Sequence, residues 1–209
     1  MLAVAFSPDG ALLATASYAG RLDLWDVATR KRHGRSMAVT DDGFSSVAFD
    51  ASGQFVAAGS FGPVRVWRVA DQRLAFPPRA GHTGPVTGAS FDRAGTLLAT
   101  TSLFGATRLW DPATGLGYGN ELASSPVPAS LQPQIDLPIL PLRNAFSPDG
   151  KRLAVGGLET VAMLWDVDPA VWRQRACAVA GRNLTREEWR LYLPSGTDYR
   201  ATCAQWPAP

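Results

Sequence analysis

GHTGPVTGASFDRAGTLLATTSLFGATRLWDPATG, at residues 81–115, carries a plan that three other segments of the chain repeat. In each segment a Phe closes an apolar run, a turn follows, and a second and third run lead to a Trp. The Phe–Trp separations are 19, 18, 19 and 19 residues, for Phe6 and Trp25, Phe49 and Trp67, Phe91 and Trp110, and Phe146 and Trp165. From Phe to Phe the period is 43, 42 and 55 residues. This matches the period of about 40–45 residues of four-stranded repeat units, with one insertion.

The first segment shows how each repeat is built. Residues 2–6 form a short apolar run, and the SPDG turn at residues 7–10 reverses it, because Pro8 presets the first turn dihedral and Gly10 accepts a positive φ. Residues 11–17, ALLATAS, are apolar or small throughout and too few for a buried helix, which predicts a strand covered on both faces. Two further strands are predicted, an alternating one at 21–26 and a more polar one within 28–39.

The third interval between repeats contains 12 extra residues between Gly115 and Asn144, together with five prolines. Such a composition predicts an extended surface connection, although a Pro-rich segment can also be a ligand for the aromatic groove of a partner. The predicted organisation is therefore four repeat units at about 1–40, 41–80, 81–122 and 140–167, with an insertion at 116–143 and a C-terminal tail at 168–209.

The motifs VAFSPDG, LLATAS and LWD resemble those of WD-repeat β-propellers, in particular the bacterial type, over residues 2–167. The resemblance implies an all-β fold, a partial β-propeller of four blades with four antiparallel strands each. It also implies a role as a platform for protein interactions.

In this family a blade is braced by hydrogen bonds among a His, a Ser or Thr, an Asp and a Trp. Only the third repeat has the His, which gives His82, Ser102 and Trp110, and Phe104 stands where the Asp is expected. The other repeats lack the His and have Ala19, Gly62 and Glu159 at or near the position of the Asp, while each keeps its tryptophan: Trp25, Trp67 and Trp165. No repeat has the complete set, so apolar packing must hold the blades.

The tail has helix signals. Asp168 is placed as an N-cap, Pro169 at the first helical position and Gly181 as a stop, and Thr185 with Glu188 forms a capping-box pattern for a second short helix that ends at Pro194. The fold class is thus an open arc of blades with a short α-helical tail. The tail also resembles the closing segment of large bacterial WD-repeat proteins in which a signalling NTPase or a protein kinase domain precedes the propeller.

The two cysteines, Cys177 and Cys203, both lie in the tail. The first is on the apolar face of the predicted helix and the second follows a returning turn, so we expect them to be close together and to form a disulfide if this end is extracytoplasmic. A cytoplasmic location is otherwise favoured, and the compartment stays open. No apolar run approaches the roughly 18 residues that a membrane span needs.

Catalytic chemistry is not indicated. The chain has 20 basic and 18 acidic residues, a net charge of +2, and two histidines, His33 and His82. It has no phosphate-binding loop, no HExxH, no paired Cys motif with metal-site spacing and no nucleophile elbow. We therefore predict no enzyme activity, no cofactor, no metal and no nucleic-acid partner.

Three aromatic residues, Tyr18, Phe61 and Phe104, recur every 43 residues in the turn between the second and third strands. This period places them on one face of three successive blades, where they are candidate partner-binding residues. The alternative is that each packs on the edge of the neighbouring blade.

The predicted function is a non-catalytic scaffold for protein–protein interaction, the C-terminal sensor or partner-binding end of a larger bacterial signalling protein. The alternative is a propeller that binds a small ligand or acts as an enzyme through its central channel. Since the chain begins at an inner strand and the fourth repeat runs into a helix, we expect a three-stranded fourth blade in a fragment whose open flanks need upstream blades or a second copy.

Overall fold

The computed structural model describes residues 3–38, 43–60, 62–82, 84–103, 106–119, 121–123, 143–156, 162–192 and 198–207. The chain divides into two compact units, Met1–Trp165 (unit 1) and Asp166–Pro209 (unit 2). This division lies two residues from the end of the predicted repeat region. Most of the predicted insertion, residues 124–142, lies outside the described residues.

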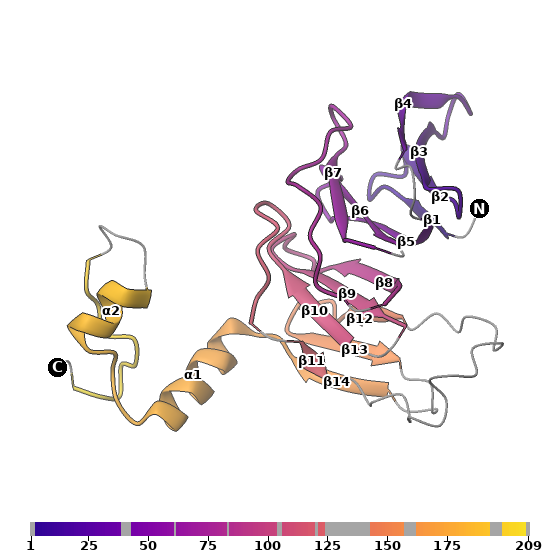
Figure 1. Cartoon of the computed structure of the whole chain (residues 1–209). Helices are drawn as coiled ribbons and strands as arrows, with labels where there is room; N and C mark the ends of the chain where they lie inside the picture. Colours follow the sequence, from indigo (N-terminus) through magenta and orange to yellow (C-terminus); the bar gives the residue numbers. More distant parts are fainter. Residues whose placement is uncertain are drawn as a thin grey trace. The chain divides into compact units, whose positions relative to one another are not determined.

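The described residues of unit 1 form four antiparallel sheets (Figure 1). Sheet 1 contains β1 (Ala3–Phe6), β2 (Leu12–Ala16), β3 (Arg21–Asp26) and β4 (Arg32–Ala38). Sheet 2 contains β5 (Phe44–Phe49), β6 (Phe55–Ser60) and β7 (Arg65–Arg68). Sheet 3 contains β8 (Val86–Phe91), β9 (Leu98–Ser102), β10 (Ala106–Trp110) and β11 (Leu122–Ala123), and sheet 4 contains β12 (Asn144–Phe146), β13 (Arg152–Gly156) and β14 (Ala162–Asp166).

The turn after the first strand of each sheet is closed by a short polar side chain. In sheet 1 the Leu12 N–H donates to Ser7 Oγ at 2.8 Å, and in sheet 2 the Phe55 N–H donates to Asp50 Oδ1 at 2.7 Å. The SPDG and DASG sequences therefore fold the same hairpin with different acceptors. Gly10 and Gly53 take φ values of 71° in these turns, a region that favours glycine.

The first strands of successive sheets lie next to one another: β1 contacts β5, β5 contacts β8, and β8 contacts β12. One apolar core joins sheets 1 and 2 and includes Leu22, Leu24 and Phe44, all fully buried. A second joins sheets 2 and 3 around Val66 and Leu98. Burial of each large apolar side chain contributes about 1.5–3 kcal/mol. The predicted all-β fold, a partial β-propeller, is confirmed.

The sheets differ at their outer strands. Sheet 4 has three strands among the described residues, as expected. Sheet 2 also has three, but isolated bridges pair Val64 with Arg79 and Trp67 with Leu74, so the segment after β7 runs beside that strand without forming a regular one.

A side chain of sheet 2 holds the outermost strand of sheet 1. Gln72 lies in the turn after β7 with a φ of 55° and is 7% exposed. Its Oε1 accepts from the Arg35 N–H and its Nε2 donates to the His33 carbonyl, both at 2.7 Å. Gly34 has a φ of 67°, a region that favours glycine, and a Cβ there would also lie 2.5 Å from the Gln72 amide.

Unit 2 contains α1 (Pro169–Ala180) and α2 (Arg186–Tyr192), which confirms the predicted helical tail. Asp168 caps α1 by accepting from the Ala170 N–H, and Gly181 ends it in the left-handed conformation. At α2 the Glu188 N–H donates to Thr185 Oγ1 and the Thr185 N–H donates to Glu188 Oε2, which is a reciprocal capping box. Within the described ranges, no helix has both the length and the apolar character of a membrane span.

Candidate functional site

Of the three predicted partner-binding aromatic residues, the structure describes one. Tyr18 lies in the turn between β2 and β3 and is 65% exposed. Phe61 and Phe104 lie outside the described residues, so the common aromatic face stays a prediction.

Sheet 3 contains a cluster of three polar side chains, His82, Thr100 and Trp110. The Trp110 Nε1–H donates to Thr100 Oγ1 at 2.7 Å, and His82 Nε2 lies 2.7 Å from the same oxygen. Thr100 is fully buried and Trp110 is 4% exposed. The cluster joins the segment before β8 to both β9 and β10, so its contacts are those of a structural brace. Gly81 is part of it, because a Cβ there would lie 2.7 Å from the Trp110 ring.

The sequence predicted that Ser102 would supply the hydroxyl of this cluster. In the structure the hydroxyl belongs to Thr100 instead. The register explains the difference: Trp110 lies opposite Leu98 and Arg108 lies opposite Thr100, so the indole reaches its diagonal neighbour Thr100. Ser102 lies further along β9, and its Oγ accepts from the Ala106 N–H at 3.3 Å. It closes the next turn instead of contacting the tryptophan.

The same diagonal contact recurs in sheet 1, where the Trp25 Nε1–H donates to Thr15 Oγ1 at 2.9 Å. In sheet 2 the equivalent position is Ala58 and in sheet 4 it is Val155. Neither side chain has a hydroxyl. The Nε1 of Trp165 in sheet 4 is buried and has no hydrogen-bond partner among the described residues. Alignment of the repeats on Thr15 and Thr100 was the signal that could have identified this contact from the sequence.

His82 is neutral in this environment. Burial lowers its pKa from 6.5 to about 4, and the nearby Arg108 lowers it further than Glu121 raises it. Its Nδ1 is buried without a partner among the described residues. A histidine with this pKa does not carry a proton near neutral pH, and no carboxylate in the described part of the chain hydrogen-bonds to it to form a catalytic pair.

Metal ligation has no support in the described part of the chain, where no group of three or more His, Cys, Asp or Glu side chains converges. A second cluster of hydrogen-bonded polar side chains lies in unit 2.

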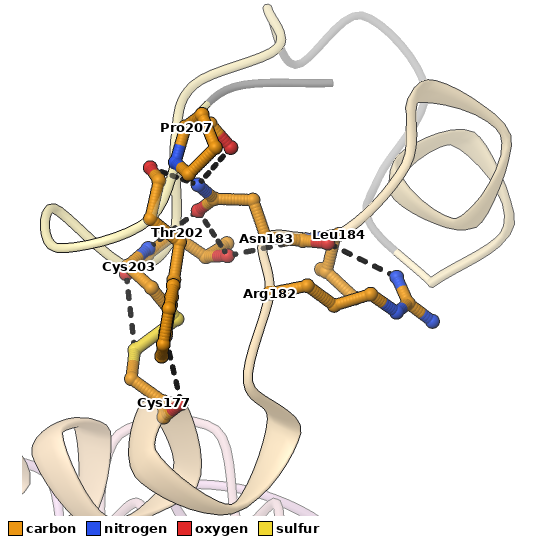
Figure 2. The surroundings of a disulfide bond; sticks show 8 residues. Cys177, Arg182, Asn183, Leu184, Thr202, Cys203 and Pro207 are labelled. Atoms are coloured by element: carbon orange, nitrogen blue, oxygen red, sulfur yellow. Dashed lines mark hydrogen bonds between the residues drawn. A yellow bond between two sulfur atoms is a disulfide. The ribbon is translucent and has the colours of Figure 1, made fainter.

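Unit 2 is organised around the disulfide between Cys177 in α1 and Cys203 in the C-terminal segment, whose Cα atoms are 5.5 Å apart. Figure 2 shows Asn183 beside this bond, between the end of α1 and the returning chain. Asn183 Oδ1 accepts from the Cys203 N–H at 2.7 Å and from Thr202 Oγ1 at 3.2 Å. Its Nδ2 donates to the Trp206 and Pro207 carbonyls at 2.8 and 2.9 Å. Sequence reasoning missed Asn183, because its partners are about 20 residues away.

Comparison with known proteins gives matches over much of the chain. The family model "WD domain, G-beta repeat" (WD40) matches residues 1–26 and 76–111. The Periodic tryptophan protein 2 homolog of Schizosaccharomyces pombe is 35% identical over 126 residues, which are 59% of this chain and 13% of that protein. Periodic tryptophan protein 2 of Arabidopsis thaliana is 30% identical over 207 residues, 96% of this chain and 21% of that protein. The chain thus spans about a fifth or less of these relatives.

Among solved structures, the crystal structure of the computationally designed Ika4 protein has a TM-score of 0.63 at 17% identity, over 79% of this chain and 90% of that one. This likeness concerns the fold alone. The curated relatives named here are eukaryotic, so the expected link to bacterial NTPase- or kinase-linked proteins gains no support from them. The sequence match and the sheet geometry agree that this chain carries WD40 repeats folded as a partial β-propeller.

Proposed function

We propose that the chain is a non-catalytic scaffold that binds protein partners through the two uncovered faces of its sheet array. The single observation that carries the proposal is a difference in exposure between equivalent residues of the repeats. In sheets 1 to 3 the residue immediately before the Trp is Leu24, Val66 or Leu109. Each of these side chains is at most 2% exposed. Leu164 occupies the same position in sheet 4 and is 62% exposed.

The opposite face is uncovered at sheet 1. Phe6 and Val4 are 63% and 53% exposed, whereas their equivalents Phe49 and Val47 in sheet 2 are packed in the first core. Inside the array, the Leu face of one sheet packs on the Phe and Trp face of the next. The Leu164 face therefore fits a sheet that presents Phe and Trp, and the Phe6 face fits a sheet that presents Leu and Ala.

The partners that match this chemistry are further WD-type sheets, supplied by upstream blades or by a second copy of the chain. Burial of Leu164 and Phe6 would each contribute about 1.5–3 kcal/mol. The test is size-exclusion chromatography with light scattering on the purified chain and on the variants Leu164→Glu and Phe6→Glu, with Leu116→Glu, which is also 62% exposed, as the matched control.

We expect the unaltered chain and the Leu116→Glu variant to self-associate or to aggregate. The Leu164→Glu and Phe6→Glu variants should lose this association. Adding about three upstream repeats should give a soluble monomer. A stable monomer with one cooperative unfolding transition from the unaltered chain would contradict the proposal.

A finer proposal makes the chain the C-terminal, partner-binding end of a larger bacterial signalling protein. It rests on the tail sequence after Asp168, which resembles the end of such proteins. Sequencing the coding region upstream of Met1 tests it: an NTPase or kinase domain is expected, and further repeats alone would contradict it. A ligand or substrate in the central channel, the other candidate, has no specific observation in its favour.

We also propose that unit 2 matures in an oxidising, extracytoplasmic compartment, because it contains a disulfide. Thiol titration of protein isolated from its source without reductant should find no free cysteine. Two reactive thiols in that preparation would favour a cytoplasmic location.

A further inference from the structure

Unit 2 contains a cavity of about 720 Å³, bounded by one face of α1, the segment after it, α2 and the returning C-terminal segment. Its apolar lining includes Leu184, the Cys177–Cys203 disulfide and Trp189. This volume lies within the roughly 300–1,000 Å³ of ligand-binding pockets. It is large enough for a peptide of a few residues.

The described residues that line this cavity include three arginines, Arg173, Arg182 and Arg200, and no acidic residue. The guanidinium of Arg182 is already occupied, because it donates to both carboxylate oxygens of Glu188 at 2.7 Å. Hydrogen bonds from Arg182 lower the pKa of Glu188 to about 2, so this pair stays ionised. Arg173 and Arg200 are exposed and make no ion pair with any described residue.

The neutral polar groups of the cavity are satisfied within the protein. Both amide atoms of Asn183 are used by the returning chain, and Thr202 Oγ1 donates to Asn183 and accepts from the Leu184 N–H. The groups left to bind a ligand are therefore two guanidinium forks beside an apolar lining. Guanidinium binds carboxylates in a bidentate manner, and this geometry makes Arg suited to acidic partners.

Single-stranded nucleic acid also carries negative charge, but its binding sites combine cations with aromatic rings on which bases stack. The aromatic residue that lines this cavity, Trp189, is 4% exposed and packs edge-on against Tyr199 with ring centroids 5.4 Å apart. Its faces do not offer a stacking platform. The charge and the apolar lining together favour a peptide.

We propose that this cavity binds an acidic peptide segment of a protein partner, with carboxylates on Arg173 and Arg200 and an apolar side chain against Leu184 and the disulfide. The site lies within unit 2 and does not depend on the uncovered sheet faces of unit 1. Failure of one proposal therefore leaves the other unaffected.

The test uses fluorescence polarisation with the full oxidised chain and a labelled pentapeptide of alternating aspartate and leucine. Comparison probes are the same peptide with serine in place of leucine, and an oligothymidylate of eight nucleotides. The variants are Arg173→Gln, Arg200→Gln and the double variant. Arg190→Gln in α2 is the matched control, because Arg190 is exposed and lies outside the cavity lining.

We expect saturable binding of the aspartate–leucine peptide that weakens roughly tenfold or more in the double variant and stays unchanged in Arg190→Gln. The serine peptide should bind more weakly than the leucine peptide. Equal binding by the double variant and the control, tighter binding of the oligothymidylate, or no saturable peptide binding would each overturn the proposal. The near-ultraviolet circular dichroism spectrum checks that every variant keeps its fold.

Discussion

Sheets 3 and 4 have the same Phe–Trp plan, but their tryptophans lie in different environments. In sheet 3 the indole of Trp110 donates to Thr100, which also contacts His82. In sheet 4 the equivalent hydroxyl is absent at Val155, and the buried Nε1 of Trp165 has no partner among the described residues. The comparison shows that the repeat maintains the apolar plan more strictly than the polar brace. Hydrogen bonding therefore adds to blades whose shape is already set by packing.

The largest expected effect comes from removing the indole itself. Trp110→Ala should lower the free energy of unfolding by about 3–5 kcal/mol, because it opens a cavity in a buried site and removes a hydrogen bond. Trp165→Ala should cost less, since Trp165 is only half-buried and its Nε1 has no described partner. Urea denaturation followed by circular dichroism measures both. Equal losses would mean that the two blades are equivalent despite the brace.

The next effect is the pH dependence of the brace. The pKa of His82 is about 4 in the folded chain and 6.5 ordinarily, so the unfolded chain takes up a proton more readily. The stability that depends on neutral His82 is complete above about pH 6.5 and is lost as the pH falls toward 4, by up to about 3 kcal/mol.

Urea denaturation of the unaltered chain and of His82→Gln at pH 7, 5.5 and 4 isolates this effect. The difference in unfolding free energy between the two proteins should shrink or reverse as the pH falls. A constant difference across this range would show that His82 is not buried in its neutral form.

A smaller effect is expected from the hydroxyl alone. Thr100→Val keeps the volume but leaves the Trp110 Nε1–H without its acceptor and His82 without its neighbour, which should cost about 1–3 kcal/mol. Thr15→Val in sheet 1 is the matched control. It should cost less, because Thr15 and Trp25 are half-buried and no histidine joins them. A larger loss at Thr15 would contradict the role assigned to His82.

The smallest effect is a gain. Val155→Thr in sheet 4 would supply the hydroxyl that Trp165 lacks, and should raise the free energy of unfolding by about 1 kcal/mol. The thermal midpoint should rise by a few degrees. A loss of stability would mean that the Trp165 indole does not reach this position.

The sequence was sufficient for features that depend on neighbours along the chain. The SPDG, DASG and DRAG turns, the strands that they connect, the Asp168 and Gly181 caps and the Thr185–Glu188 capping box are all local, and the structure has each of them. Gly-containing turns and capping side chains specify backbone conformation within a few residues, which is why they could be predicted.

Contacts that depend on the register between strands, or on the approach of distant segments, could not be predicted in the same way. Ser102 and Thr100 are both hydroxyl residues on β9, and only the pairing of β9 with β10 decides which one meets Trp110. Gln72 finds its partners in another sheet, 37 and 39 residues away. Asn183 finds its partners in the chain that returns past α2.

The contact between Gln72 and β4 has a mechanical consequence. The inner strands of sheets 1 and 2 meet along β1 and β5, whereas Gln72 contacts β4, the outermost strand of sheet 1. A small rotation of one sheet about the inner strands displaces the outer strands most, so a hydrogen bond placed there opposes the rotation with the longest lever. One amide side chain can thus restrain the angle between two sheets more effectively than a contact of equal strength near the inner strands.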